Sequence, residues 1–337
     1  MDPSAPTWSS SPARSGGALA QRVAVERLPP AFARFEHQPE QMPAGAPGKL
    51  GLLQLRFEAQ DGRTRLASGY ASGPQRVGRA LHLDPELPGM AFAFIQSVSG
   101  GILQGDRLGV EITVAERAQA HVTTQSATKL YRMDRNYATQ RLRVRVESGA
   151  YLEFLPDYLI PYRNARFYQE VTLEVADDAT VVFSDALAPG RTASGETFAY
   201  DLLHTRLEAR DLFGGLRFTD TLLLEPGRRD PRRTGSLAGR SDLGTLYVLT
   251  RAVGSSGLAD RLHDCVNAVS GVVGGASRLP GGDGVVARMI GDSSRAVQAA
   301  LHQAWRTVRT ATLGVGVPRI HSVKYGQEPT DPPYERA

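Results

Sequence analysis

Hydrophobic and polar residues alternate over most of the chain, beginning near residue 50. Apolar side chains occupy every second position in residues 53–57, 108–114, 142–146 and 171–175. A period of two gives a strand one face toward a core and one toward solvent, which is typical of antiparallel sheets. Turn signals built on glycine, proline and aspartate separate these runs.

The pattern between residues 50 and 253 predicts about a dozen or more strands that need no connecting helix. We therefore predict a mainly β fold: a large antiparallel β-sheet or β-helix-like single domain, rather than alternating strands and helices. Two continuously apolar runs, residues 90–98 and 180–187, are predicted to be strands buried on both faces.

The last third of the chain changes to helical spacing. Apolar residues recur at intervals of three and four in residues 258–269 and 297–311. The second run follows Asp292-Ser293-Ser294, a capping signal. Residues 284–290 are predicted to be a strand, and the glycine-rich stretch 271–284 is interpreted as a mobile turn. We thus expect about two C-terminal helices.

The first 47 residues differ in composition from the rest. They contain eight of the 21 prolines and many serines, with weak periodicity. Such a composition buries too little apolar surface to offset chain entropy. We predict a disordered tail over residues 1–47, a single domain over residues 48–322 and a flexible tail over residues 323–337.

Composition and charge narrow the class of protein. The chain has 41% hydrophobic and 22% charged residues, a net charge of +4 and one cysteine. A single cysteine excludes an intrachain disulfide framework and fits a reducing compartment, so we expect a cytoplasmic protein. No apolar run reaches the roughly 18 residues of a membrane span. The arginines of residues 228–233 are interspersed with Asp230 and Pro231, which favours a solvated loop over a nucleic-acid patch.

Several catalytic motifs are missing from the sequence. It contains no GxxxxGK[ST] phosphate loop, no GxSxG elbow, no HExxH and no paired CxxC. Cys265 lies on an apolar helical stripe, which favours core packing. Asp260, His263 and Asp264 share one helical face and could hold a metal, although a solvated face is the favoured interpretation.

Three segments stand out from the strand pattern. GGILQGD at residues 100–106 is a glycine turn that ends in a carboxylate, and TTQSATKLYR at 123–132 places hydroxyls, an amide and a lysine at a strand end. The third, residues 149–169, holds Glu153 and Asp157 and is followed by GRTASGE at 190–196. Turns, caps and ion pairs within a β fold would by themselves account for such residues.

Taken in order, these segments resemble the UreD (UreH) family of urease accessory proteins. The matching positions are Gly100-Gly101, Gly105-Asp106, Thr123-Thr124-Gln125, Lys129, Tyr131-Arg132, Glu153, Leu155-Pro156, Ile160-Pro161-Tyr162, Gln169, Gly190-Arg191, Gly195-Glu196 and Pro318-Arg319-Ile320. The resemblance covers roughly residues 48–322. The chain departs from the family in its proline-rich N-terminal segment and in the His321-Ser322 ending.

The resemblance implies a non-enzymatic maturation factor with a largely β fold and a few helices. Members of the family bind UreF and, through it, the GTPase UreG. That assembly docks on the urease apoprotein and helps to install its nickel ions, by a proposed route through a tunnel in the UreD-like protein. No tightly bound cofactor is expected, and nickel would bind transiently.

Transient nickel binding calls for isolated oxygen ligands rather than histidine or cysteine clusters, because nitrogen and sulfur ligands hold nickel firmly. The candidates for a nickel path are Asp106, Glu153, Asp157 and Glu196, with Thr123, Thr124 and Gln125. The alternative is that Asp106 caps its turn and Glu153 pairs with an arginine. Two other functions stay open: a carbohydrate or small-molecule enzyme that uses two carboxylates, and a protein-binding module without a metal role.

Overall fold

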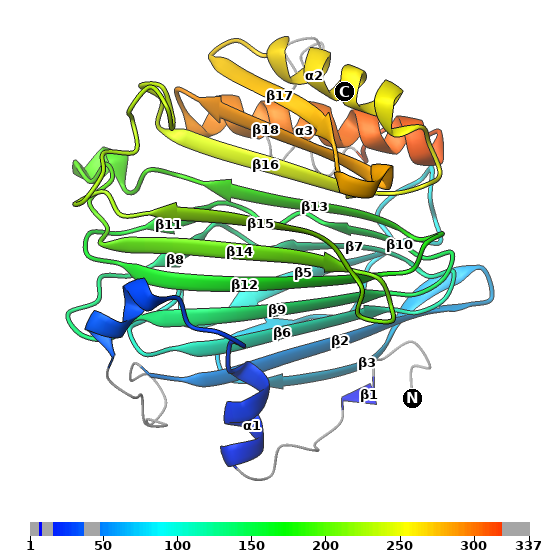
Figure 1. The fold of residues 1–337 in the computed structure, drawn as a ribbon. Coiled ribbons are helices and arrows are strands. Elements are labelled where there is room, and N and C mark those ends of the chain that lie inside the picture. Colours follow the sequence, from blue (N-terminus) through cyan, green and yellow to red (C-terminus); the bar gives the residue numbers. More distant parts are fainter. Residues whose placement is uncertain (1–6, 9–15, 37–47, 319–337) are drawn as a thin grey trace, which may run out of the picture.

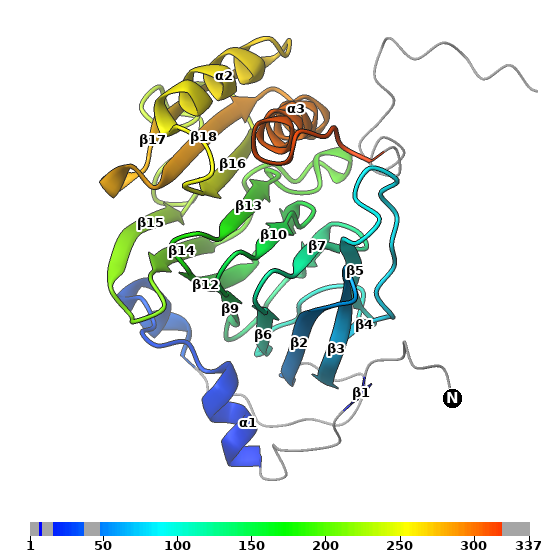
Figure 2. The same cartoon turned by 90° about the vertical axis from the view of Figure 1, so that its right-hand side faces the viewer.

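The structure is a computed structural model that describes residues 7–8, 16–36 and 48–318. Two large β-sheets face one another, and two helices cover the outer face of the second sheet (Figures 1 and 2). The prediction of a mainly β, β-helix-like single domain with C-terminal helices is confirmed. None of the described helices is long and apolar enough to cross a membrane.

The first sheet, sheet A, has eight described strands. In spatial order they are β1 (Thr7–Trp8), β3 (Arg63–Ser72), β2 (Leu50–Gln60), β6 (Arg107–Val114), β9 (Ala138–Val146), β12 (Arg166–Val175), β14 (Leu202–Arg210) and β15 (Leu216–Leu224).

The second sheet, sheet B, has ten described strands. Its main path runs β17 (Val272–Arg278), β18 (Gly284–Gly291), β16 (Asp242–Leu249), β13 (Thr180–Leu187), β10 (Tyr151–Phe154), β7 (Gln119–Thr124), β5 (Ala91–Ser97) and β4 (Gln75–Val77). The short strands β8 (Thr128–Leu130) and β11 (Leu159–Pro161) pair beside this path.

The antiparallel part of the prediction is wrong for the centre of both sheets. Strands β2, β6, β9, β12 and β14 pair in parallel, as do β5, β7, β10 and β13. Antiparallel pairing occurs toward the ends of the sheets, for example between β14 and β15 and between β13 and β16. The chain alternates between the sheets, as a solenoid does, so successive strands of one sheet run in the same direction. Each strand still has one face inward and one outward, so the period of two is the same for either direction.

The core between the sheets follows directly from that alternation. Leu53, Val110, Leu142 and Leu173 from sheet A meet Phe183 and its inward-facing neighbours from sheet B in one buried cluster. The two runs predicted to be buried strands correspond to β5 and β13, and β13 is buried along nearly its whole length. Its odd-numbered residues face the interior, and its even-numbered residues Val182 and Ala186 face the helices.

The two predicted helices are α2 (Ser255–Asn267) and α3 (Ser294–Leu313), which pack on the outer face of sheet B. The Ser293 hydroxyl caps α3 by accepting a hydrogen bond from the Ala296 N–H at 3.3 Å. The glycine-rich stretch 271–284 is not simply a turn, because it contains strand β17. Gly274 allows α2 to approach that strand, since a Cβ there would lie 2.4 Å from the Val266 side chain.

The prediction of a disordered tail is wrong for residues 16–36. Helix α1 (Gly16–Val23) and the 3₁₀ helix η1 (Pro30–Phe35) pack on the outer face of sheet A, where Val23 and Phe32 are fully buried. Phe32 contacts the rings of Tyr137 and Tyr168. The prediction relied on the composition of all 47 residues together, and this average does not reveal a short apolar segment within them. Residues 1–6, 9–15, 37–47 and the predicted C-terminal tail 323–337 lie outside the described residues.

Candidate functional site

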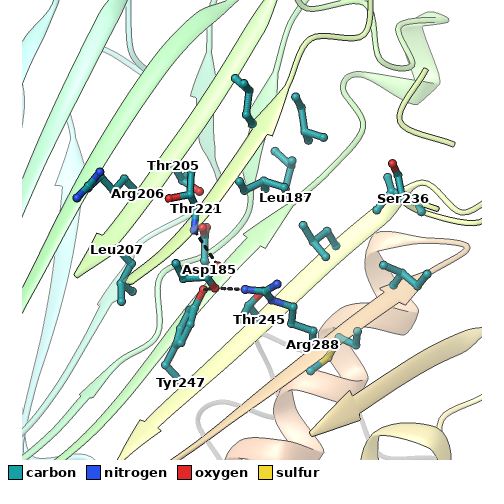
Figure 3. Close-up of a pocket in the computed structure, with 18 of the residues that line it drawn as sticks. Asp185, Leu187, Thr205, Arg206, Leu207, Thr221, Ser236, Thr245, Tyr247 and Arg288 are labelled. Carbon is teal, nitrogen blue, oxygen red and sulfur yellow. Dashed lines mark hydrogen bonds and ion pairs between the residues drawn. The ribbon is translucent and has the colours of Figure 1, made fainter. Parts of the chain in front are cut away.

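The larger of two neighbouring cavities opens where sheet A ends at β15 and sheet B continues into β16, β18 and β17. It has a volume of about 490 Å³ and walls rich in leucine. Its polar side chains include Asp185, Thr245, Tyr247 and Arg288, which project toward one another from three strands of sheet B (Figure 3). Asp220 of β15 also lines it and contacts Tyr247 and Arg288. We call this space the outer cavity.

A second cavity of about 170 Å³ lies between the two sheets and is called the inner cavity. It is lined by more polar side chains than the outer one, among them Gln140 and Gln169 from sheet A and Gln125, which follows β7. Phe183 and Asp185 line both cavities. The two spaces are therefore separated by the side chains of one strand, β13.

Asp185 is the carboxylate at this boundary. It lies on the inward face of β13, and no ion pair joins it to another described side chain. Burial raises the pKa of Asp185 to about 6, against a smaller opposing effect of the Ala186 backbone N–H. Its charge therefore changes within a pH range close to neutrality, and a cation in either cavity would stabilise the ionised form.

Three of the residues predicted from the sequence line the inner cavity: Thr124, Gln125 and Asp157. The Asp157 backbone N–H donates to the Thr124 hydroxyl at 2.9 Å. The Asp157 carboxylate accepts a bond of 3.5 Å from the Gln298 side chain of α3. Asp157 thus lies between the inner cavity and the C-terminal helix.

Asp106 lies outside both cavities and caps its turn. Its two carboxylate oxygens accept backbone N–H bonds from Lys49 and Leu103, each 2.9 Å long. Burial raises the pKa of Asp106 despite these donors. The capping alternative for Asp106 is therefore observed in the structure.

Thr123, another residue predicted for the nickel path, is also buried. Its hydroxyl donates to the Leu155 carbonyl at 2.6 Å.

Glu196 forms a local ion pair in its loop. The Arg191 guanidinium donates to both of its carboxylate oxygens, at 2.6 and 2.9 Å, and the Arg163 backbone N–H adds a third bond. The hydrogen bonds from Arg191 hold the pKa of Glu196 below its usual value. The arrangement orders residues 190–196 beside Tyr162, whose ring lies 4.1 Å from the Arg191 guanidinium.

Glu153 lies on the opposite face of sheet B, under α3. It contacts His121 Nδ1 at 2.7 Å and Arg309 Nη1 at 3.2 Å, and Arg309 also pairs with Asp84. We call these four buried side chains the α3 network. Burial by itself would favour a neutral Glu153, but the hydrogen bond and charge of His121, with the charge of Arg309, outweigh it and lower the pKa. The arginine-pairing alternative for Glu153 is thus observed.

Of the four predicted carboxylates, Asp157 is the one that lines either of these cavities. They do not converge on one point, as an acid and a base acting on a sugar must. Across the described ranges, no three histidine, cysteine, aspartate or glutamate residues are grouped to hold a metal ion. The sequence interpretation missed Asp185, although a carboxylate within the apolar run 180–187 was the available signal.

Comparison with known proteins places this geometry in a family. The family model described as UreD urease accessory protein matches residues 49–322. The "Urease accessory protein UreD" of Cenarchaeum symbiosum is 36% identical over 280 residues, which cover 83% of this chain and 98% of that protein. The "Urease accessory protein UreD 2" of Streptomyces griseus is 39% identical over 84% of this chain and 97% of its own. The UreD of Yersinia pseudotuberculosis serotype O:1b is 38% identical over 86% and 91%.

Proposed function

The chain belongs to the UreD family of urease accessory proteins and so has a role in urease maturation; from this premise we propose that it carries nickel ions through the space between its two sheets. The observation that carries the proposal is Asp185, one half-buried carboxylate that lines both cavities. A cation held there could exchange between the outer and the inner cavity without crossing bulk solvent.

The chemistry of the lining suits passage better than storage. A single carboxylate with neighbouring hydroxyl and amide oxygens binds a divalent cation weakly, whereas nitrogen and sulfur clusters bind nickel firmly. From Asp185 the proposed path continues past Gln140 and Gln169 to Thr124 and Asp157. In this path the ion is cargo, and each oxygen holds it briefly.

We further propose that the chain works in the cytoplasm as a non-enzymatic scaffold. It would bind UreF and, through UreF, the GTPase UreG, and the assembly would dock on the urease apoprotein. The printed sequence contains no GxxxxGK[ST] motif, so GTP would be bound by UreG. The urease accessory names of the relatives support the maturation role.

The test is Asp185→Asn, with Asp260→Asn as the matched control. Asp260 is exposed on α2, so its substitution removes the same charge far from both cavities. Urease would be activated with nickel, GTP, UreF, UreG and each variant, and nickel per active site would be measured. We expect severalfold lower loading with Asp185→Asn, unchanged co-purification with UreF, and normal loading with the control.

Normal nickel loading by Asp185→Asn would contradict the interior path. Loss of UreF binding by the same variant would show that the substitution disturbs the scaffold, and loading would then be measured with Asp157→Asn. Asp157 lines the inner cavity at a different strand end, so the path predicts reduced loading there as well.

A further inference from the structure

The mouth of the outer cavity is spanned by a side-chain contact between the two sheets. Arg288 of β18 in sheet B forms an ion pair with Asp220 of β15 in sheet A. The Tyr247 hydroxyl of β16 donates to the same Asp220 carboxylate at 2.5 Å. The strands themselves do not pair across this opening in the described sheets; its two sides are joined by these side chains and by the loop between β15 and β16, whose Ser236 and Leu237 also line the cavity.

The pair lies between solvent and the cavity. The Arg288 side chain is 55% exposed, and the Asp220 side chain is 20% exposed. A partly exposed ion pair contributes little to stability, so the arginine can leave its partner at little cost. Asp220 would remain in place, because the Tyr247 ring packs between Phe183 and Phe218.

We propose that Arg288 is a tethered counter-ion that controls access of divalent cations to the outer cavity, an inference that rests on the interior nickel path. With Arg288 in place, its guanidinium neutralises the Asp220 carboxylate and repels an approaching cation. When its side chain swings into solvent, Asp220 becomes an oxygen ligand at the mouth. The cation then has two carboxylates in succession, Asp220 at the mouth and Asp185 inside.

Arg206 provides a charge-loss control close to the same cavity. The residue borders the outer cavity, but its side chain lies on the outer face of sheet A, where it is 44% exposed and pairs with Glu208 of its own strand. Replacing Arg206 by glutamine removes one positive charge near the cavity without releasing Asp220. A general loss of nearby positive charge and a specific release of Asp220 can therefore be separated.

The experiment measures uptake of Ni²⁺ by the full chain, followed as the rate at which bound nickel becomes protected from a fast chelator. We expect Arg288→Gln to take up nickel about tenfold faster, the scale of an electrostatic effect on association. Arg288→Lys should behave like the unmodified chain, and Arg206→Gln should change the rate by less than about twofold. Adding Asp185→Asn should abolish protected binding in every background.

The outcomes separate the proposed control of access by Arg288, which we call the gate, from the interior nickel path. Equal rates for Arg288→Gln and Arg206→Gln, with binding still dependent on Asp185, would overturn the gate and leave the path standing. Protected binding that ignores Asp185→Asn would overturn the path and the gate with it. If Arg288→Gln does not fold, as judged by its melting temperature, Asp220→Asn replaces it. That variant keeps the arginine and loses the ligand, so uptake faster than in the unmodified chain would refute the gate.

Discussion

Two carboxylates, the buried Glu153 and the half-buried Asp185, lie on neighbouring strands of sheet B and have opposite electrostatic environments. Glu153 points outward from β10 into the α3 network, where His121 and Arg309 keep it ionised. Asp185 points inward from β13 into two cavities, and burial raises its pKa to about 6.

The difference shows that burial alone does not assign a role to a carboxylate. Glu153 is buried beside His121 and Arg309, so its charge stabilises the packing of α3 on the sheet. Asp185 is half-buried without an ion-pair partner among the described side chains, so its charge destabilises the fold and is available to a cation. We interpret the first as a structural group and the second as a functional one.

The largest expected effect comes from breaking the α3 network with Arg309→Met. This change leaves Glu153 and Asp84 buried without their arginine and should cost about 3–5 kcal/mol of unfolding free energy. Chemical denaturation would measure it, with Arg306→Met, on the exposed side of α3, as the control. A loss of unfolding free energy no greater than that of the control would show that the α3 network does not stabilise the packing of the helix.

Asp106 sharpens the comparison, because backbone N–H groups rather than charged side chains satisfy it. Asparagine offers one acceptor oxygen where the aspartate offers two, so Asp106→Asn leaves one of two backbone donors unpaired. We expect a loss of about 1–3 kcal/mol in unfolding free energy. An unchanged melting temperature together with reduced nickel loading would instead support a role for Asp106 in the nickel path.

The change expected for Asp185→Asn has the opposite sign, a gain in stability instead of a loss. Because the folded pKa of Asp185 is about 6 against a reference of 3.8, its ionisation costs stability as pH rises through that window. At pH 7.5 the asparagine variant should therefore be more stable by about 1–3 kcal/mol, and near pH 4 the gain should vanish.

The check is the unfolding free energy of Asp185→Asn and of the unmodified chain from pH 4 to 7.5. Glu153 should have the reverse dependence, because a lowered folded pKa contributes stability that is lost as pH falls. A destabilised Asp185→Asn at neutral pH would mean that the carboxylate is paired and that the contrast with Glu153 is mistaken.

Much of the fold and some of the site could be predicted from the sequence. Ordered motifs such as residues 100–106 and 190–196 indicated the family, and a helix cap within Asp292-Ser293-Ser294 was predicted from local chemistry. Those features depend on residues that are neighbours in the chain. The docked segment 16–36 was missed, because its few apolar residues gain their burial from a distant sheet surface.

The sequence by itself determined the element types, the inward and outward faces of the strands, and the family. The tertiary structure decided the direction of strand pairing, because alternation has the same period in parallel and antiparallel sheets. It also decided which carboxylate faces a cavity. Asp185, Glu153 and Asp106 all lie within or beside strands, but their surroundings differ. Glu153 pairs with Arg309 and Asp106 accepts a hydrogen bond from Lys49, both far away in the chain, whereas Asp185 faces the open space between the two sheets.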